Sequence, residues 1–190
     1  MQNGEGSGDF QTHVDQLLKA IDLCLQGKLY IPGLLLIYAG FDGMAWLERP
    51  QGQYDVKQAD FVKWVENYLL PNSELKCSSV DLYAARCGLL HTGTATSSRT
   101  RSGHARKMFY TIGEKGEALF QLTLNDKKLP VFVEVHKLAD ALVSGIARFQ
   151  EQIKADASLA ELVYTRARDY FSEVQMNPQR PIGGEAMLES

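Results

Sequence analysis

Apolar residues recur every three or four positions through much of the chain, which is the spacing of one face of an α-helix. The first such stretch covers residues 10–29, and Gly27 lies near its end. A second helix is expected over residues 32–47, because Pro32 suits a first helical turn. Residues 1–9 are polar and rich in glycine, and we expect them to form a disordered tail.

Two further helices are expected before the middle of the chain. The third is centred on residues 61–69, with Asp60 as its N-cap and Pro71 at its end. The fourth begins at Ser78-Ser79-Val80-Asp81, where a serine precedes a carboxylate by three positions, as in a capping box. It continues to about His91, before a loop rich in serine, threonine and glycine.

The period of the apolar residues changes in the next segment. Residues 108–112 are β-like, and residues 120–124 alternate between apolar and polar as in a half-buried strand. We therefore expect a β-hairpin within residues 106–135. Residues 130–133 either add a third strand or lead straight into the next helix.

Helical spacing returns after the strands. It predicts one helix through residues 138–153 and a last one through residues 159–171. Residues 176–190 contain two prolines and two glycines and are expected to be a flexible tail. The pattern as a whole predicts a single mostly α domain over residues 10–175, a helical bundle with a β-hairpin inserted after the fourth helix.

Charge adds to this picture because it is unevenly distributed. The 190-residue chain has a net charge of -3, which argues against a protein that coats nucleic acid or an anionic membrane all over. Residues 76–107, however, hold six lysines and arginines against Asp81 alone, a local net charge of +5. A cationic patch on an acidic body fits a site for an anion.

Several kinds of chemistry find no support in the spacing of residues. The three cysteines form no CxxC pair and the histidines share no metal-ligand spacing, so we expect reduced thiols, no metal and no cofactor. Residues 1–8 do not resemble a signal peptide, and the most apolar window, residues 31–46, is too short to span a bilayer. We expect a cytoplasmic protein that does not bind membranes.

The fourth helix carries the main candidate for chemistry. In Arg86-Cys87-Gly88-Leu89-Leu90-His91, an arginine and a histidine lie five positions apart. A histidine with a pKa near neutrality can take a proton from a ribose hydroxyl or give one to a leaving oxygen. An arginine can hold a phosphate through two N–H groups and offset the charge of the transition state, without a metal. The alternative is structural: Arg86 pairs with a surface carboxylate, and His91 caps the helix C-terminus.

A basic segment follows this motif directly. It could bind an RNA backbone, with Phe109 or Tyr110 stacking on a base, or it could be an ordinary solvated loop. Its cationic members are Arg99, Arg101, His104, Arg106 and Lys107.

Two other residues could support the motif. Asp42, a carboxylate in an apolar helix, could orient Arg86 or His91, and the alternative is a partly exposed aspartate without that role. Tyr83 lies three residues before Arg86 and could hydrogen-bond a phosphate, or it could belong to the core or to an interface.

Residues 82–91, Leu-Tyr-Ala-Ala-Arg-Cys-Gly-Leu-Leu-His, resemble the signature of HEPN domains (higher eukaryotes and prokaryotes nucleotide-binding). These are small all-α bundles with an R-x4-6-H motif on a late helix. Many are metal-independent endoribonucleases of toxin–antitoxin, abortive-infection and CRISPR systems. In their typical site two protomers pack their motif helices together, so that both Arg–His pairs line one cleft. The resemblance implies a homodimeric endoribonuclease in which Arg86 and His91 are the catalytic pair.

The resemblance also allows a second function. Active family members often have a polar residue after the motif arginine, where this chain has Cys87. Inactive members form dimers that bind a nucleotide, RNA or a protein partner such as an antitoxin or a nucleotidyltransferase. The chain is similar to uncharacterised bacterial HEPN-like proteins in its motif helix and, more loosely, in the helix order of residues 10–93. The part beyond residue 105 would be an elaboration of the family fold.

Overall fold

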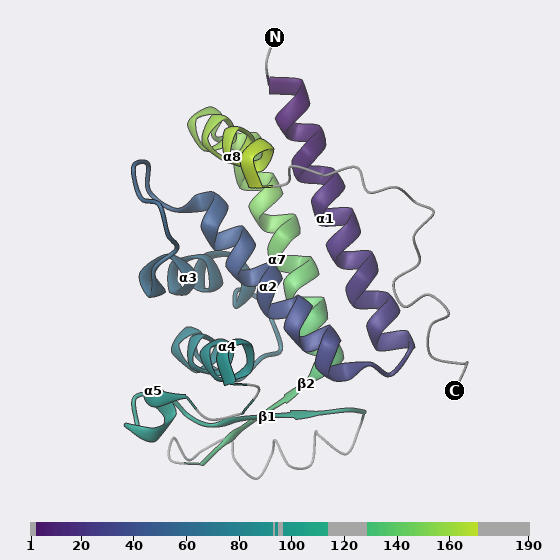
Figure 1. Ribbon diagram of the computed structural model, residues 1–190, viewed down its shortest axis with the longest axis vertical. Helices are drawn as coiled ribbons and strands as arrows, with labels where there is room; N and C mark the ends of the chain where they lie inside the picture. Colours follow the sequence, from purple (N-terminus) through teal and green to yellow (C-terminus); the bar gives the residue numbers. More distant parts are fainter. Residues whose placement is uncertain (1–2, 93, 95–96, 114–128, 171–190) are drawn as a thin grey trace, which may run out of the picture.

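The computed structural model describes residues 3–92, 94, 97–113 and 129–170, and this part of the chain is mostly helical (Figure 1). Long helices surround α2, and a small sheet lies at one end of the bundle beside α4 and α5. The helices are α1 (Asn3–Gln26), α2 (Tyr30–Glu48), α3 (Gln58–Trp64), its π-helical continuation η1 (Val65–Leu69), α4 (Ser79–Thr92), α5 (Ser98–Arg101), α7 (Val135–Ala155) and α8 (Ala157–Tyr170). The strands are β1 (Met108–Thr111) and β2 (Val131–Glu134). The expected mostly α fold class is confirmed.

Helix α2 is the centre of the bundle and contacts α1, α3, α4, α7 and α8. Ile37 and Phe41 are fully buried in it. Gly40 permits the close packing, because a Cβ atom there would lie 3.0 Å from side-chain carbons of both Leu17 and Leu142. The helix is longer than the apolar window of residues 31–46, and by length and composition alone its 19 residues could cross a bilayer. In the structure, however, 56% of its most apolar window is buried by the other helices.

Helix α1 begins at Asn3, although the sequence favours a disordered tail over residues 1–9. Gly6 accounts for the difference, because it is buried against the backbone of Tyr164 in α8. One turn later, Phe10 is only 3% exposed. Packing against α8 therefore stabilises a helical start whose glycines have low intrinsic helix propensity.

Capping interactions define where α3 and α4 begin. The capping box predicted for α4 is confirmed, since the Asp81 N–H donates to Ser78 Oγ at 3.1 Å and the Ser78 N–H donates to the Asp81 carboxylate at 3.0 Å. Asp60 is not the N-cap of α3 but its third residue, and its carboxylate accepts the N–H of Lys57 at 2.7 Å. Both aspartates satisfy backbone N–H groups beside a helix N-terminus.

The two described strands pair in parallel, with Met108 opposite Val131. The pairing of residues 108–111 with residues 131–134 is not the expected hairpin pairing, which is antiparallel and involves residues 120–124. The expected second strand of that hairpin, residues 120–124, lies outside the described residues, as does the tail expected at 176–190. An alternating pattern identifies a strand but not its partner or direction.

The sheet is joined to the bundle at both strands. β2 continues directly into α7, so residues 130–133 contribute a strand and also lead into a helix. Glu134 caps that helix, because its carboxylate accepts the N–H of Lys137 at 2.9 Å. In β1 the Tyr110 hydroxyl lies 2.7 Å from the hydroxyl of Tyr38 in α2, a hydrogen bond inside the core. These contacts hold the sheet on the side of the bundle where α4 lies.

Candidate nucleic-acid interface

Helix α4 has an inner face in the bundle and an outer face at its surface. Leu82 and Ala85 are buried, at 0% and 6% exposure, whereas Arg86, Cys87 and Leu90 are half-buried. The neighbours of the helix are α2 and α3 in the bundle, together with α5 and β1. Arg86 therefore lies at the edge of α4 and not in the core.

Arg86 forms an ion pair with Asp42 of α2. Its Nε and one terminal nitrogen each lie 2.6 Å from the same carboxylate oxygen. The two side chains are 19% and 18% exposed, so solvent still reaches the pair. Burial acts to lower the pKa of Arg86, but the hydrogen bond and charge of Asp42 raise that pKa above its ordinary value. The fold thus brings together two candidate residues that are 44 positions apart in the sequence.

His91 lies in the last turn of α4, and its side chain is outside the described part of the structure. The helix continues through Gly88 to Thr92. Five residues of α-helix rise about 7.5 Å and turn about 140°, so Arg86 and His91 do not lie on one stripe of the helix.

Tyr83 and Arg99 are packed together between α3 and α4. The Tyr83 ring meets Phe61 edge-on, with 5.4 Å between ring centroids, and burial raises the pKa of its hydroxyl. The Arg99 guanidinium lies 5.4 Å from the centroid of the same ring and donates a hydrogen bond to Gln58. Arg99 is therefore held against the body of the protein instead of extending from the basic segment.

Arg106 is also engaged by a carboxylate. Its backbone N–H donates to Asp81 at 2.7 Å, and its Nε and one terminal nitrogen donate to the other oxygen at 3.1 and 2.8 Å. The Asp81 side chain is only 4% exposed. Burial acts to raise the pKa of Asp81, but hydrogen bonds from Ser78 and Arg106 lower it below its ordinary value. This cluster connects the residues before β1 to the N-terminus of α4.

The remaining cations of the basic segment are exposed. Arg101, His104 and Lys107 all have exposed side chains. His104 Nδ1 lies 2.7 Å from the hydroxyl of Ser102. The Lys107 ammonium lies 4.9 Å from the ring centroid of Phe109, which is itself 38% exposed. Of the two aromatic candidates for base stacking, the fold thus leaves Phe109 accessible and turns Tyr110 into the core.

An open groove of about 770 Å³ lies beside these residues. We call it the α4–β1 groove, because the N-terminus of α4, helix α5 and the start of β1 surround it. Its lining includes Ser78, Asp81, His104, Arg106, Lys107 and Phe109. Three of the five predicted RNA-binding cations line this groove. His104 and Lys107 are exposed, and Arg106 is paired with Asp81.

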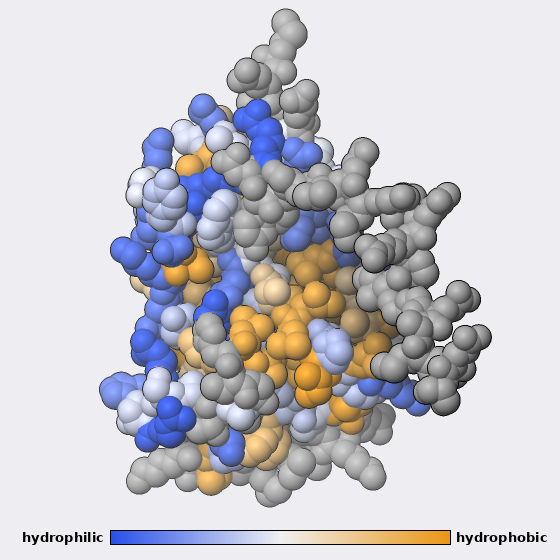
Figure 2. Space-filling model, viewed as in Figure 1, coloured by the Kyte–Doolittle hydropathy of each residue, from blue (hydrophilic) through white to orange (hydrophobic). Residues whose placement is uncertain are grey.

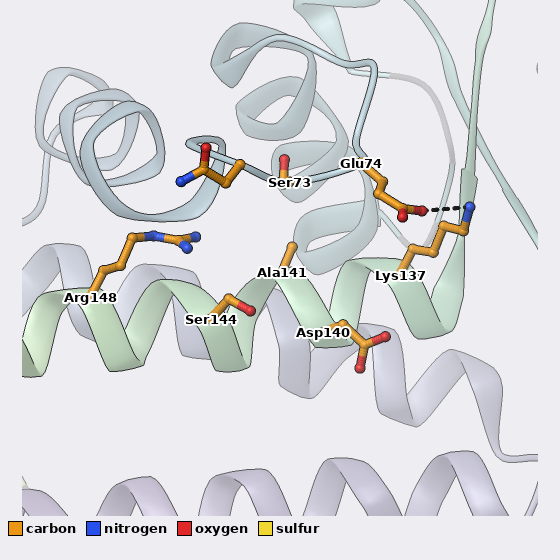
Figure 3. Close-up of a pocket in the computed structure, with 8 residues that line it drawn as sticks. Ser73, Glu74, Lys137, Asp140, Ala141, Ser144 and Arg148 are labelled. Atoms are coloured by element: carbon orange, nitrogen blue, oxygen red, sulfur yellow. Dashed lines mark ion pairs between the residues drawn. The ribbon is translucent and has the colours of Figure 1, made fainter.

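A second, smaller pocket of about 280 Å³ was not foreseen from the sequence (Figure 3). It lies between α7 and the segment after η1, and an ion pair of 2.8 Å joins Glu74 and Lys137 at one end of it. At the other end, Arg148 donates to the carbonyl of Tyr68 at 2.6 Å and so caps η1. The charged residues that line it are far apart in the sequence and form no recognisable motif.

The described residues offer little for metal or thiol chemistry. Within residues 3–92, 94, 97–113 and 129–170, no three His, Cys, Asp or Glu side chains gather as a metal site would require. The cysteines there are free thiols, and burial raises the pKa of Cys77 to about 12.

No protein-family model, curated protein or solved structure matches this chain.

Proposed function

We propose that this protein is a metal-independent endoribonuclease of the HEPN type, active as a homodimer whose composite site contains Arg86 and His91. The observation that carries the proposal is the Asp42–Arg86 ion pair on the accessible edge of the motif helix. The Arg86 side chain is 19% exposed, so solvent and a bound phosphate can reach its guanidinium. Held by a carboxylate on a neighbouring helix, the guanidinium is positioned before any substrate binds.

The chemistry follows from these two side-chain types. His91 would take the proton of a ribose 2′-hydroxyl, and the 2′-oxygen would attack the adjacent phosphorus. The bond from phosphorus to the 5′-oxygen of the next nucleotide then breaks, and that oxygen receives a proton from the His91 of the second protomer. The products are a 2′,3′-cyclic phosphate and a 5′-hydroxyl. Arg86 would stabilise the negative charge that accumulates on the phosphoryl oxygens.

An apolar surface next to the ion pair supports the dimer. On α2, Asp42 lies on the same face as Ile31 and Leu35, since seven and eleven residues correspond to nearly whole turns. Ile31 is 61% exposed, and Leu23 and Leu29 nearby are 58% and 55% exposed. Figure 2 shows apolar side chains gathered over α2 and the C-terminal half of α1. A patch of this kind marks a contact surface, and a second copy seated there would approach Arg86.

The test is cleavage of a mixed pool of single-stranded RNA in the presence of EDTA. The purified protein should give fragments ending in 2′,3′-cyclic phosphate, and His91→Ala should give none while remaining dimeric. His136→Ala is the matched control, because its imidazole lies on α7 with 51% exposure, away from α4, where it contacts Glu134 and the ring of Tyr30. Cleavage by His91→Ala would contradict the proposal. An intact wild-type dimer that cleaves no RNA would favour the non-catalytic binding module.

A further inference from the structure

The α4–β1 groove has the size of a site for a small organic group. Its volume of about 770 Å³ lies within the range of about 300–1,000 Å³ typical of ligand pockets. It is separated from the proposed catalytic residues along the motif helix. Ser78 lines the groove and Arg86 is eight residues further on, a rise of about 12 Å in an α-helix.

The charge of this groove favours an anion. Its acidic lining residue, Asp81, is buried at 3% exposure and is neutralised by three hydrogen bonds from Arg106. The side chains of His104 and Lys107, which line the same groove, are exposed. Arg101 is exposed on the short helix beside them. The floor is therefore neutral overall, and the rim carries the positive charge.

The groove also offers a rigid aromatic surface. Phe109 lines it with 38% exposure, and its ring is stacked on Phe132 of the neighbouring strand with centroids 5.6 Å apart and planes inclined by 23°. The Lys107 ammonium lies over the same ring, 4.9 Å from its centroid. A base that stacks on this ring takes the place of the ammonium, which can move on its flexible side chain to the adjacent phosphate.

We propose that the α4–β1 groove binds an unpaired nucleotide of a single-stranded RNA, with the base on Phe109 and the phosphate at Lys107 and His104. This inference rests on the proposed function, since the strand that enters the groove would be the one cleaved beside Arg86. The separation along α4 makes the bound nucleotide one that flanks the cleaved bond. The groove then sets where along a strand the protein cuts.

Binding to an uncleavable strand tests this independently of catalysis. We would measure fluorescence anisotropy of a labelled single-stranded RNA ten nucleotides long, with 2′-O-methyl groups throughout, at several salt concentrations. Phe109→Ala should weaken binding about tenfold, as expected for the loss of one stacked base. Lys107→Gln should weaken it and lower the slope of log affinity against log salt by about one, because one phosphate contact is lost.

Matched controls come from surface positions elsewhere. Tyr54→Ala removes an aromatic ring that is 91% exposed, and Lys154→Gln removes an ammonium whose side chain is 68% exposed. Both should leave RNA affinity unchanged. Wild-type affinity in Phe109→Ala and Lys107→Gln would overturn the proposal, as would an affinity for free mononucleotides equal to that for the strand.

The outcome separates the two proposals. If the groove variants lose affinity but the wild-type protein cleaves no RNA, the groove binds RNA and the enzymatic function is wrong. If cleavage depends on His91 while the groove variants bind and cleave as the wild type does, only the groove proposal fails.

Discussion

Helix α4 carries two arginine–aspartate pairs, and they differ in how they are built. Asp81 is 4% exposed and accepts N–H groups from both the side chain and the backbone of Arg106. Asp42 is 18% exposed and accepts hydrogen bonds from the side chain of Arg86. Asp81 of the first pair also belongs to the capping box of α4, whereas the second pair joins α4 to α2.

The difference indicates different roles for two residue pairs that look alike in sequence. A carboxylate that is buried, caps a helix and anchors a strand is part of the folded framework, and removing it leaves several groups unsatisfied. A pair whose carboxylate is also partly exposed, beside an apolar surface, can meet a ligand or a second protomer. We therefore expect substitutions at Asp81 and Arg106 to act on stability and substitutions at Arg86 to act on function.

The largest effect is expected at Arg86. Arg86→Gln should reduce RNA cleavage by about 100- to 1,000-fold, the range typical for loss of a group that stabilises transition-state charge. Arg106→Gln should reduce cleavage per folded molecule by less than about tenfold, an effect exerted through binding in the groove. Initial cleavage rates in EDTA, corrected for folded fraction by circular dichroism, measure both. Equal losses in the two variants would remove the functional distinction between the pairs.

The apolar surface beside Asp42 provides a second way to separate the pairs. Ile31→Asp places a charge on a side chain that is 61% exposed in one protomer, so the monomer should stay folded while the dimer dissociates at least tenfold more readily. Cleavage should fall in proportion to the lost dimer. Analytical ultracentrifugation beside the cleavage assay gives both values, with Val143→Asp as control because that side chain is exposed on α7. A dimer as stable as the wild type would place the contact elsewhere.

The free energy of unfolding should depend more on the Asp81–Arg106 pair than on the Asp42–Arg86 pair, the reverse of the order expected for cleavage. Asp81→Ala should lower the free energy of unfolding by about 3–5 kcal/mol, because it leaves a partly buried guanidinium without its carboxylate and removes a helix cap. Asp42→Ala should cost about 1–2 kcal/mol, since the Asp42 carboxylate is more exposed than that of Asp81. Urea unfolding followed by tryptophan fluorescence reports both values. If Asp42→Ala lowered the free energy of unfolding as much as Asp81→Ala does, both pairs would be structural.

Acid unfolding distinguishes the buried carboxylate further. Hydrogen bonds hold the pKa of Asp81 below its ordinary value of 3.8, so its contribution is present above that pH and is lost as the pH falls through the lowered pKa. Asp81→Asn should therefore show a smaller decline of unfolding free energy between pH 5 and about pH 2 than the wild type does. Glu134→Gln is a useful comparison, because hydrogen bonds lower the pKa of Glu134 as well. If the unfolding free energy of Asp81→Asn declined as steeply at low pH as that of the wild type, protonation of Asp81 would not be a cause of the decline.

The sequence predicted those features that depend on neighbours along the chain. Periodicity located the helical segments, and the Ser78–Asp81 capping box was recognisable because both partners lie within four residues. The partners of the charged residues could not be predicted in the same way. Arg106 pairs with a residue 25 positions away and Arg99 with one 41 positions away, so the local positive charge was visible in the sequence but its partners were not.

The same limit explains the sheet and the second pocket. Short apolar runs mark strands, but parallel pairing of β1 with β2 depends on the path of the chain between them. The pocket beside α7 is lined by Glu74, Lys137 and Arg148, which form no spaced motif. Asp42 is an intermediate case: its charge in an apolar helix was a visible signal, and its partner became identifiable only in three dimensions.

The smallest expected effects test the same contrast within one strand, at adjacent residues of β1. Tyr110→Phe should cost about 1 kcal/mol of unfolding free energy, because the Tyr38 hydroxyl loses its 2.7 Å partner and keeps only the sulfur of Met108 at 3.4 Å. Its affinity for RNA should not change, since the ring points into the core. Phe109→Ala should weaken RNA binding, and its stacking on Phe132 makes only a minor contribution to stability at 38% exposure. If Tyr110→Phe weakens RNA binding as much as Phe109→Ala does, the two faces of β1 are not separated into core and ligand surface.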